Sequence, residues 1–75
     1  MYAIVFSCHS GDGNITTRAK RLHEDKHQVD ARKEFMATQW PANMTGTKRR
    51  MELQDVNIAT GIGKIIDVRY VGDKP

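Results

Sequence analysis

Large and small side chains alternate over the first eight residues, and this alternation is typical of a β-strand. One side of the extended chain holds Tyr2, Ile4, Phe6 and Cys8, and the other holds Ala3, Val5 and Ser7. Because both sides are largely apolar, the pattern predicts a central strand with neighbours or cover on both faces.

A turn and a second strand are expected next. The segment Ser10-Gly11-Asp12-Gly13-Asn14 offers two glycines that tolerate positive φ, and its Asp and Asn side chains can bond to their own backbone. We therefore expect a hairpin whose second strand runs antiparallel from Ile15 to about Leu22. Its packed side would carry Ile15, Thr17 and Ala19, and its solvent side Thr16, Arg18 and Lys20.

One helix is predicted from about Lys26 to Gln39. Asp25 and Gln28 have the spacing of an N-cap and its reciprocal partner, and Pro41 blocks continuation past Trp40. The side that covers the sheet would carry Val29, Met36 and Trp40, with Phe35 on its flank. The opposite, solvated side would carry Lys26, Asp30 and Glu34, with an i,i+4 pair between Lys26 and Asp30.

The C-terminal third contains one or two further strands. Residues 42–48 lack periodicity and are expected to form a loop. Met51 and Leu53 alternate in one phase and Val56 and Ile58 in the other, which predicts a strand with a bulge near Gln54-Asp55; a short helix over residues 51–59 is the competing interpretation. After a turn at Thr60–Gly63, a final strand would place Ile66, Val68 and Tyr70 on one face.

These elements predict an α+β fold: a small, mainly antiparallel sheet, built from the N-terminal hairpin and one or two C-terminal strands, packed against one helix. At 75 residues and 8.5 kDa, residues 1–75 are expected to form a single compact domain. A core drawn from a hydrophobic fraction of 39% is small, so we do not expect a deep, water-free active-site cleft.

Charge and cysteine content narrow the setting. Twelve Lys and Arg against nine Asp and Glu give a net charge of +3, which favours anionic partners. The single cysteine cannot form an internal disulfide and the N-terminus lacks a signal-peptide pattern, so we expect a cytoplasmic location. The longest apolar run, Tyr2 to Phe6, is far shorter than the roughly 20 residues of a membrane span, so no membrane association is expected.

The strongest candidate for metal or thiol chemistry is a zinc or thiol-dependent site at Cys8, His23 and His27. His23 and His27 have the spacing of half a zinc site, and either imidazole could serve a Cys8 nucleophile as a base. The usual CxxC half is missing, and His9 points away from Cys8 on an extended strand. A buried structural cysteine and exposed histidines are the favoured interpretation, with no metal and no cofactor.

Catalytic and phosphate-binding motifs are not found. Gly61-Ile62-Gly63-Lys64 lacks the P-loop spacing and leads into a strand, so a hairpin turn explains its glycines. Asp30 and Glu34 lie four residues apart, but a solvated helix face would not tune a carboxylate pair for acid–base work. We expect the protein not to be an enzyme.

Surface cations are the remaining candidates for a functional site. They form two clusters in the sequence, and whether these meet in space is left open: Arg18, Lys20 and Arg21 on the second strand, and Lys48, Arg49 and Arg50 after the loop. Together they would form a basic binding surface. The competing interpretation is a solvated sheet edge whose charges oppose aggregation.

The leading hypothesis is a small non-catalytic binding protein that docks on a protein or nucleoprotein through this basic surface. The layout is comparable to that of small phage accessory and inhibitor proteins, an analogy of size and architecture alone. The alternative is direct DNA or RNA binding of low specificity by the same residues. Five aromatic residues are expected mostly on core faces, which leaves few rings for base stacking: Tyr2, Phe6, Phe35, Trp40 and Tyr70. The sequence leaves the oligomeric state open.

Overall fold

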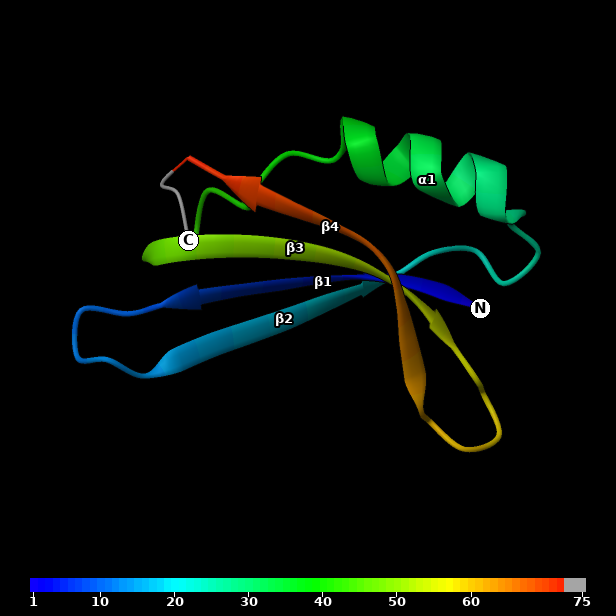
Figure 1. Ribbon diagram of the computed structural model, residues 1–75, viewed down its shortest axis with the longest axis horizontal. Coiled ribbons are helices and arrows are strands. Elements are labelled where there is room, and N and C mark those ends of the chain that lie inside the picture. The colour runs from blue at the N-terminus through cyan, green and yellow to red at the C-terminus, as the bar shows by residue number, and fades with distance from the viewer. Residues whose placement is uncertain (73–75) are drawn as a thin grey trace.

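Four strands and one helix make up the computed structural model, which describes residues 1–72. The elements are β1 (Tyr2–His9), β2 (Ile15–Arg21), α1 (Gln28–Ala37), β3 (Thr47–Val56) and β4 (Gly63–Val71). The strands form one antiparallel sheet in the order β2-β1-β3-β4, and α1 lies along one side of it (Figure 1). The predicted α+β fold, with an N-terminal hairpin and two C-terminal strands, is confirmed.

The hydrophobic core lies between the sheet and α1. Register places Ile4 of β1 opposite Leu53 of β3 and Phe6 opposite Met51, so all four side chains point to the same side of the sheet. Phe35 of α1 packs against this layer and is fully buried. The complete buried cluster is Ile4, Phe6, Cys8, Leu22, Ala31, Phe35, Met44, Met51 and Leu53.

The helix is shorter than predicted and presents a different side to the sheet. It begins at Gln28 and ends at Ala37, and its N-cap is His27 without a side-chain hydrogen bond, so the predicted Asp25 cap was wrong. Its buried residues are Ala31 and Phe35, which lie four apart on one face. The predicted covering residues Val29 and Met36 are instead 65% and 59% exposed.

Tertiary contacts explain this orientation. The Nη1 atom of Arg69, on β4, donates hydrogen bonds to the carbonyl oxygens of Phe35 (2.7 Å) and Thr38 (3.2 Å), which fixes the C-terminal end of α1 against the sheet. Trp40 packs against the core from beyond the helix, with its ring 5.7 Å from that of Phe6 in an edge-to-face arrangement. Met36, on the side of the helix that the periodicity predicts to face the sheet, lies about 100° around the helix from Phe35.

The segment after the loop is a strand, as predicted, and the competing helix is wrong. The register between β3 and β4 shifts between Leu53 and Gln54, near the predicted bulge, but the additional residue is Ile66 on β4. Ile66 consequently packs on the core, while Val68 and Tyr70 point to the other face. The prediction that all three share one face was therefore wrong, and Ile58 lies outside β3 and is exposed.

Within residues 1–72 the structure contains no helix with the length and apolar character needed to cross a bilayer.

Gly46 lets the α1–β3 loop approach β1 closely. Its φ is 156°, and a Cβ added there would lie 2.5 Å from the carbonyl oxygen of His9 and 2.9 Å from Sγ of Cys8. Because the carbonyl oxygen of His9 belongs to the backbone of β1, this clash could be relieved only by moving the loop or the strand.

We predict that Gly46→Ala lowers the free energy of unfolding by about 1–3 kcal/mol, the range for overpacking a close contact. Urea denaturation followed by Trp40 fluorescence measures the change. Gly11→Ala is the matched control, because a Cβ on Gly11 meets nothing within 4 Å. Equal stability of the two variants would contradict this account of the loop.

Candidate binding surface on the open sheet face

The sheet face opposite α1 carries the strongest candidate for a binding site. We call it the open face, because α1 and the core residues of the α1–β3 loop all lie on the other side (Figure 1). Directly paired residues point to the same side of an antiparallel sheet. The register thus assigns to the open face Ala3, Val5, Ser7, His9, Ile15, Thr17, Ala19, Arg21, Thr47, Arg50, Glu52, Gln54, Val56, Gly63, Ile65, Val68 and Tyr70, and Lys48 reaches it from an unpaired position.

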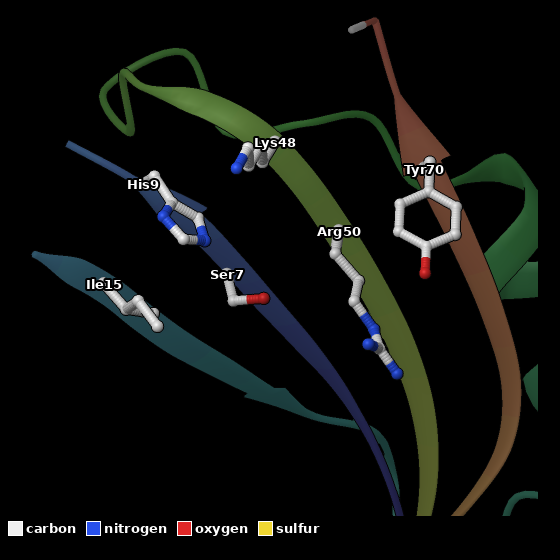
Figure 2. A pocket seen from close by; sticks show the side chains of 6 residues that line it. All are labelled: Ser7, His9, Ile15, Lys48, Arg50 and Tyr70. Carbon is white, nitrogen blue, oxygen red and sulfur yellow. The ribbon is translucent and has the colours of Figure 1, made fainter. Parts of the chain in front are cut away.

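A hollow of about 290 Å³ lies across one end of the open face. It is lined from all four strands by Ser7, His9, Ile15, Lys48, Arg50 and Tyr70 (Figure 2). Its polar groups are two hydroxyls, an imidazole, an ammonium and a guanidinium, and none of the lining residues within 1–72 is acidic. This composition suits an anion.

Arg50 is held in the hollow by its neighbours. Its Nη2 atom lies 2.8 Å from Oε2 of Glu52, and Oε1 of Glu52 accepts a hydrogen bond from Gln54. The guanidinium also lies 5.9 Å from the ring centre of Tyr70 on β4, a cation–π contact. These contacts order a long side chain before any ligand arrives, so less rotamer entropy is lost on binding.

Lys48 enters the hollow through a β-bulge. Ser7 pairs with Arg50 and His9 with Thr47, so β3 has one more residue than β1 between these pairs. Lys48 lies in this bulge with φ at 51°, in the left-handed region that L-residues rarely adopt. Its side chain is exposed and forms no ion pair with any carboxylate of residues 1–72.

The six predicted binding residues do not form one surface. Lys48 and Arg50 line the hollow, and Arg21 lies on the same face but opposite Ala3, at the other end of β1. The remaining three, Arg18, Lys20 and Arg49, point to the covered side. This follows from pairing Arg18 with Phe6, Lys20 with Ile4, and Arg49 with Val71.

Two of the cations on the covered side have partners there. Arg18 Nη1 donates to Oδ1 of Asn43 at 3.0 Å, and Lys20 Nζ lies 3.6 Å from a carboxylate oxygen of Glu34. The predicted sides of β2 were therefore reversed: Ile15 and Thr17 belong to the open face, and every residue of β2 is exposed.

The zinc or thiol alternative is not supported by the positions of its residues. Cys8 is 1% exposed, in the core, and its Sγ lies 3.6 Å from the carbonyl oxygen of Thr45. His23 follows Leu22, which bonds to Tyr2 at the opposite end of β1. Within residues 1–72 no three His, Cys, Asp or Glu side chains form a group that could hold a metal ion.

The helix carboxylates also differ from expectation. Glu34 is half-buried and pairs with Lys26 and Lys20, so its predicted solvation and the predicted pair between Lys26 and Asp30 were wrong. The hydrogen bond from Lys26, helped by the charges of both lysines and opposed by a smaller effect of burial, holds the pKa of Glu34 below its usual value.

Comparison of this chain with protein-family models, with curated proteins and with solved structures finds no significant match.

Glu34 should make stability depend on acidity. A carboxylate whose pKa is lower in the folded state stabilises the fold at pH values above its unfolded-state pKa of about 4.3. This stabilisation is lost as the pH falls through the pKa of the folded state. We predict that Glu34→Gln lowers the free energy of unfolding at pH 7 by up to about 1 kcal/mol, as expected for a partly exposed ion pair.

Urea denaturation at neutral pH and near pH 3 measures this difference, which should disappear at the lower pH. Glu24→Gln is the control, since Glu24 is exposed and unpaired within residues 1–72. A difference of the same size at both pH values would contradict the electrostatic explanation.

Proposed function

We propose that this protein is a small non-catalytic binding protein whose open face engages an anionic macromolecular partner. The observation that supports this most directly is the hollow, where side-chain donors from β1, β3 and β4 converge and no acidic residue among residues 1–72 lines the wall. Of the predicted basic residues, those of the open face take this role: Arg21, Lys48 and Arg50.

The shape of the hollow favours binding over reaction. Lys48, Ile15 and Tyr70 are exposed and the other three lining residues are half-buried, so the hollow is open to water. Nucleophilic or acid–base catalysis gains most from a water-excluded site that holds a nucleophile beside its base. Contact with a large charged surface needs only accessible, ordered donors, which the open face provides.

The mode of action that we propose is occupation of a partner's surface, as in an accessory or inhibitor protein, without a cofactor. An acidic protein or a nucleoprotein would be attracted by the unbalanced positive charge. The buried, unpaired thiol of Cys8 is consistent with a reducing, cytoplasmic setting.

Direct nucleic-acid binding is the second candidate, and Tyr70 favours it. The ring was expected in the core, but Tyr70 points to the open face and is 50% exposed beside Arg50. An exposed aromatic ring next to cations is an arrangement on which bases stack.

Charge reversal on the two sides of the molecule tests the proposed function. We predict that Lys48→Glu weakens binding to polyanions by roughly tenfold or more, because it places a carboxylate in the hollow. Lys33→Glu on the exposed surface of α1 changes the net charge equally and should have a much smaller effect.

Fluorescence anisotropy at low salt measures binding to two labelled probes, polyglutamate and an oligothymidylate of about 15 nucleotides. At least one probe should bind the wild type and discriminate between the variants. If Lys48→Glu and Lys33→Glu lose the same affinity, net charge and not the open face governs the interaction. Thermal unfolding checks that each variant is folded.

A further inference from the structure

We propose that the hollow is a subsite for one nucleotide of a single-stranded nucleic acid, with Lys48 and Arg50 on its phosphate and the Tyr70 ring stacked on its base. This inference rests on the proposed function and specifies the partner of the same surface. Three features support it: the position of Tyr70, the charge balance of the hollow and the conformation of Lys48.

Tyr70 distinguishes a nucleic acid from an acidic protein. Its ring lies on β4 on the same side of the sheet as Arg50 and is seen broad side on in Figure 2. Carboxylates of an acidic protein would use the cations and leave this half-exposed ring without a specific partner. A nucleotide offers both a phosphate for the cations and a base for the ring.

The same ring favours a single strand over a duplex. Bases in a duplex are stacked on each other and present only their edges, so a flat aromatic side chain cannot stack on them without unpairing the helix. The hollow, at about 290 Å³, is at the lower end of the range for ligand pockets and suits a single nucleotide unit.

The charge balance matches one phosphodiester. Arg50 is paired with Glu52, whereas Lys48 has no carboxylate partner within residues 1–72, so the hollow keeps about one unbalanced positive charge. Ser7, with its hydroxyl, and His9, with its imidazole, supply additional hydrogen-bonding groups along the same wall (Figure 2). A phosphodiester carries one negative charge and acceptor oxygens that fit these donors.

Lys48 is held in this place against its backbone preference. The left-handed conformation is unfavourable for a residue with a Cβ, and a glycine would relieve it. Bulges that re-aim a side chain are common beside functional sites. The bulge presents the Lys48 ammonium to the hollow, which we interpret as its purpose.

Arg21 extends the site along the open face. It lies six residues from Ile15 on β2, which corresponds to about 20 Å along the strand. A strand of nucleic acid that left the hollow in that direction would meet the Arg21 guanidinium at a later phosphate.

Variants of Tyr70 test base stacking. Tyr70→Leu should weaken binding of the oligothymidylate about tenfold, whereas Tyr70→Phe, which keeps the ring, should bind within about threefold of the wild type. Neither change should alter binding of polyglutamate. Duplex DNA of the same length should bind the wild type more weakly than the single strand.

Lys48→Gly provides an independent test, because it removes the ammonium and relieves the backbone together. Its melting temperature should be unchanged or raised by up to about 5 °C. Its affinity for the oligothymidylate should fall, and the slope of log affinity against log salt should become shallower by about 0.7, as for one lost phosphate contact. Lys33→Gln is the control for the lost positive charge. A glycine at position 33 would itself destabilise α1 and is therefore avoided.

Each outcome has one interpretation. Binding of polyglutamate that depends on Lys48, without binding of the oligothymidylate, would keep the proposed function and overturn the nucleotide subsite. Equal binding of duplex and single strand, or equal effects of Tyr70→Leu and Tyr70→Phe, would also overturn it. Failure of both probes to bind would overturn the proposed function as well.

Discussion

β1 is paired on both edges, and this position is the constraint on which the other features depend. Its two neighbours, β2 and β3, occupy both edges, and its successive side chains alternate between the two faces of the sheet. Ile4 and Phe6 meet α1 and form the core, while Val5 and Ser7 point away from it. A helix of ten residues can cover only one face of a four-stranded sheet. The open face is therefore a consequence of the same pairing that forms the core.

Two irregularities in register, one on each side of β3, shape the open face. The first lies between β1 and β3 and brings Lys48 into the hollow with a left-handed backbone. The second lies between β3 and β4 and directs Ile66 to the core, which leaves Tyr70 on the side of Arg50. Ile66 and Tyr70 are four residues apart, so in a strictly alternating strand they would lie on the same face. The register shift between β3 and β4 is what allows Ile66 to lie in the core and Tyr70 outside it. The hollow thus depends on both bulges.

The fold was largely predictable from the sequence because strand alternation and turn residues are local signals. The hairpin at Ser10–Asn14 and the strand character of β3 were recognised in this way. The covering side of α1 was not, because contacts from Arg69 and the burial of Phe35 outweigh the periodicity of the helix. Of the residues that line the candidate site, Lys48 and Arg50 were selected from the sequence by their charge. Tyr70 and His9 were missed, since their proximity depends on register between distant segments.

The positions of the carboxylates determine which cations stay unbalanced. On the covered side Glu34 pairs with both Lys20 and Lys26, so one carboxylate is shared between two ammonium groups. Among residues 1–72, Glu52 is the only carboxylate that the strands place on the open face, and Arg50 already pairs with it. Lys48 has no carboxylate partner within residues 1–72, so its charge stays unbalanced there and acts over a screening length of about 8 Å at physiological salt. The hollow therefore keeps a local excess of positive charge beside an already ordered Arg50, and a count of charges over the whole sequence does not reveal it.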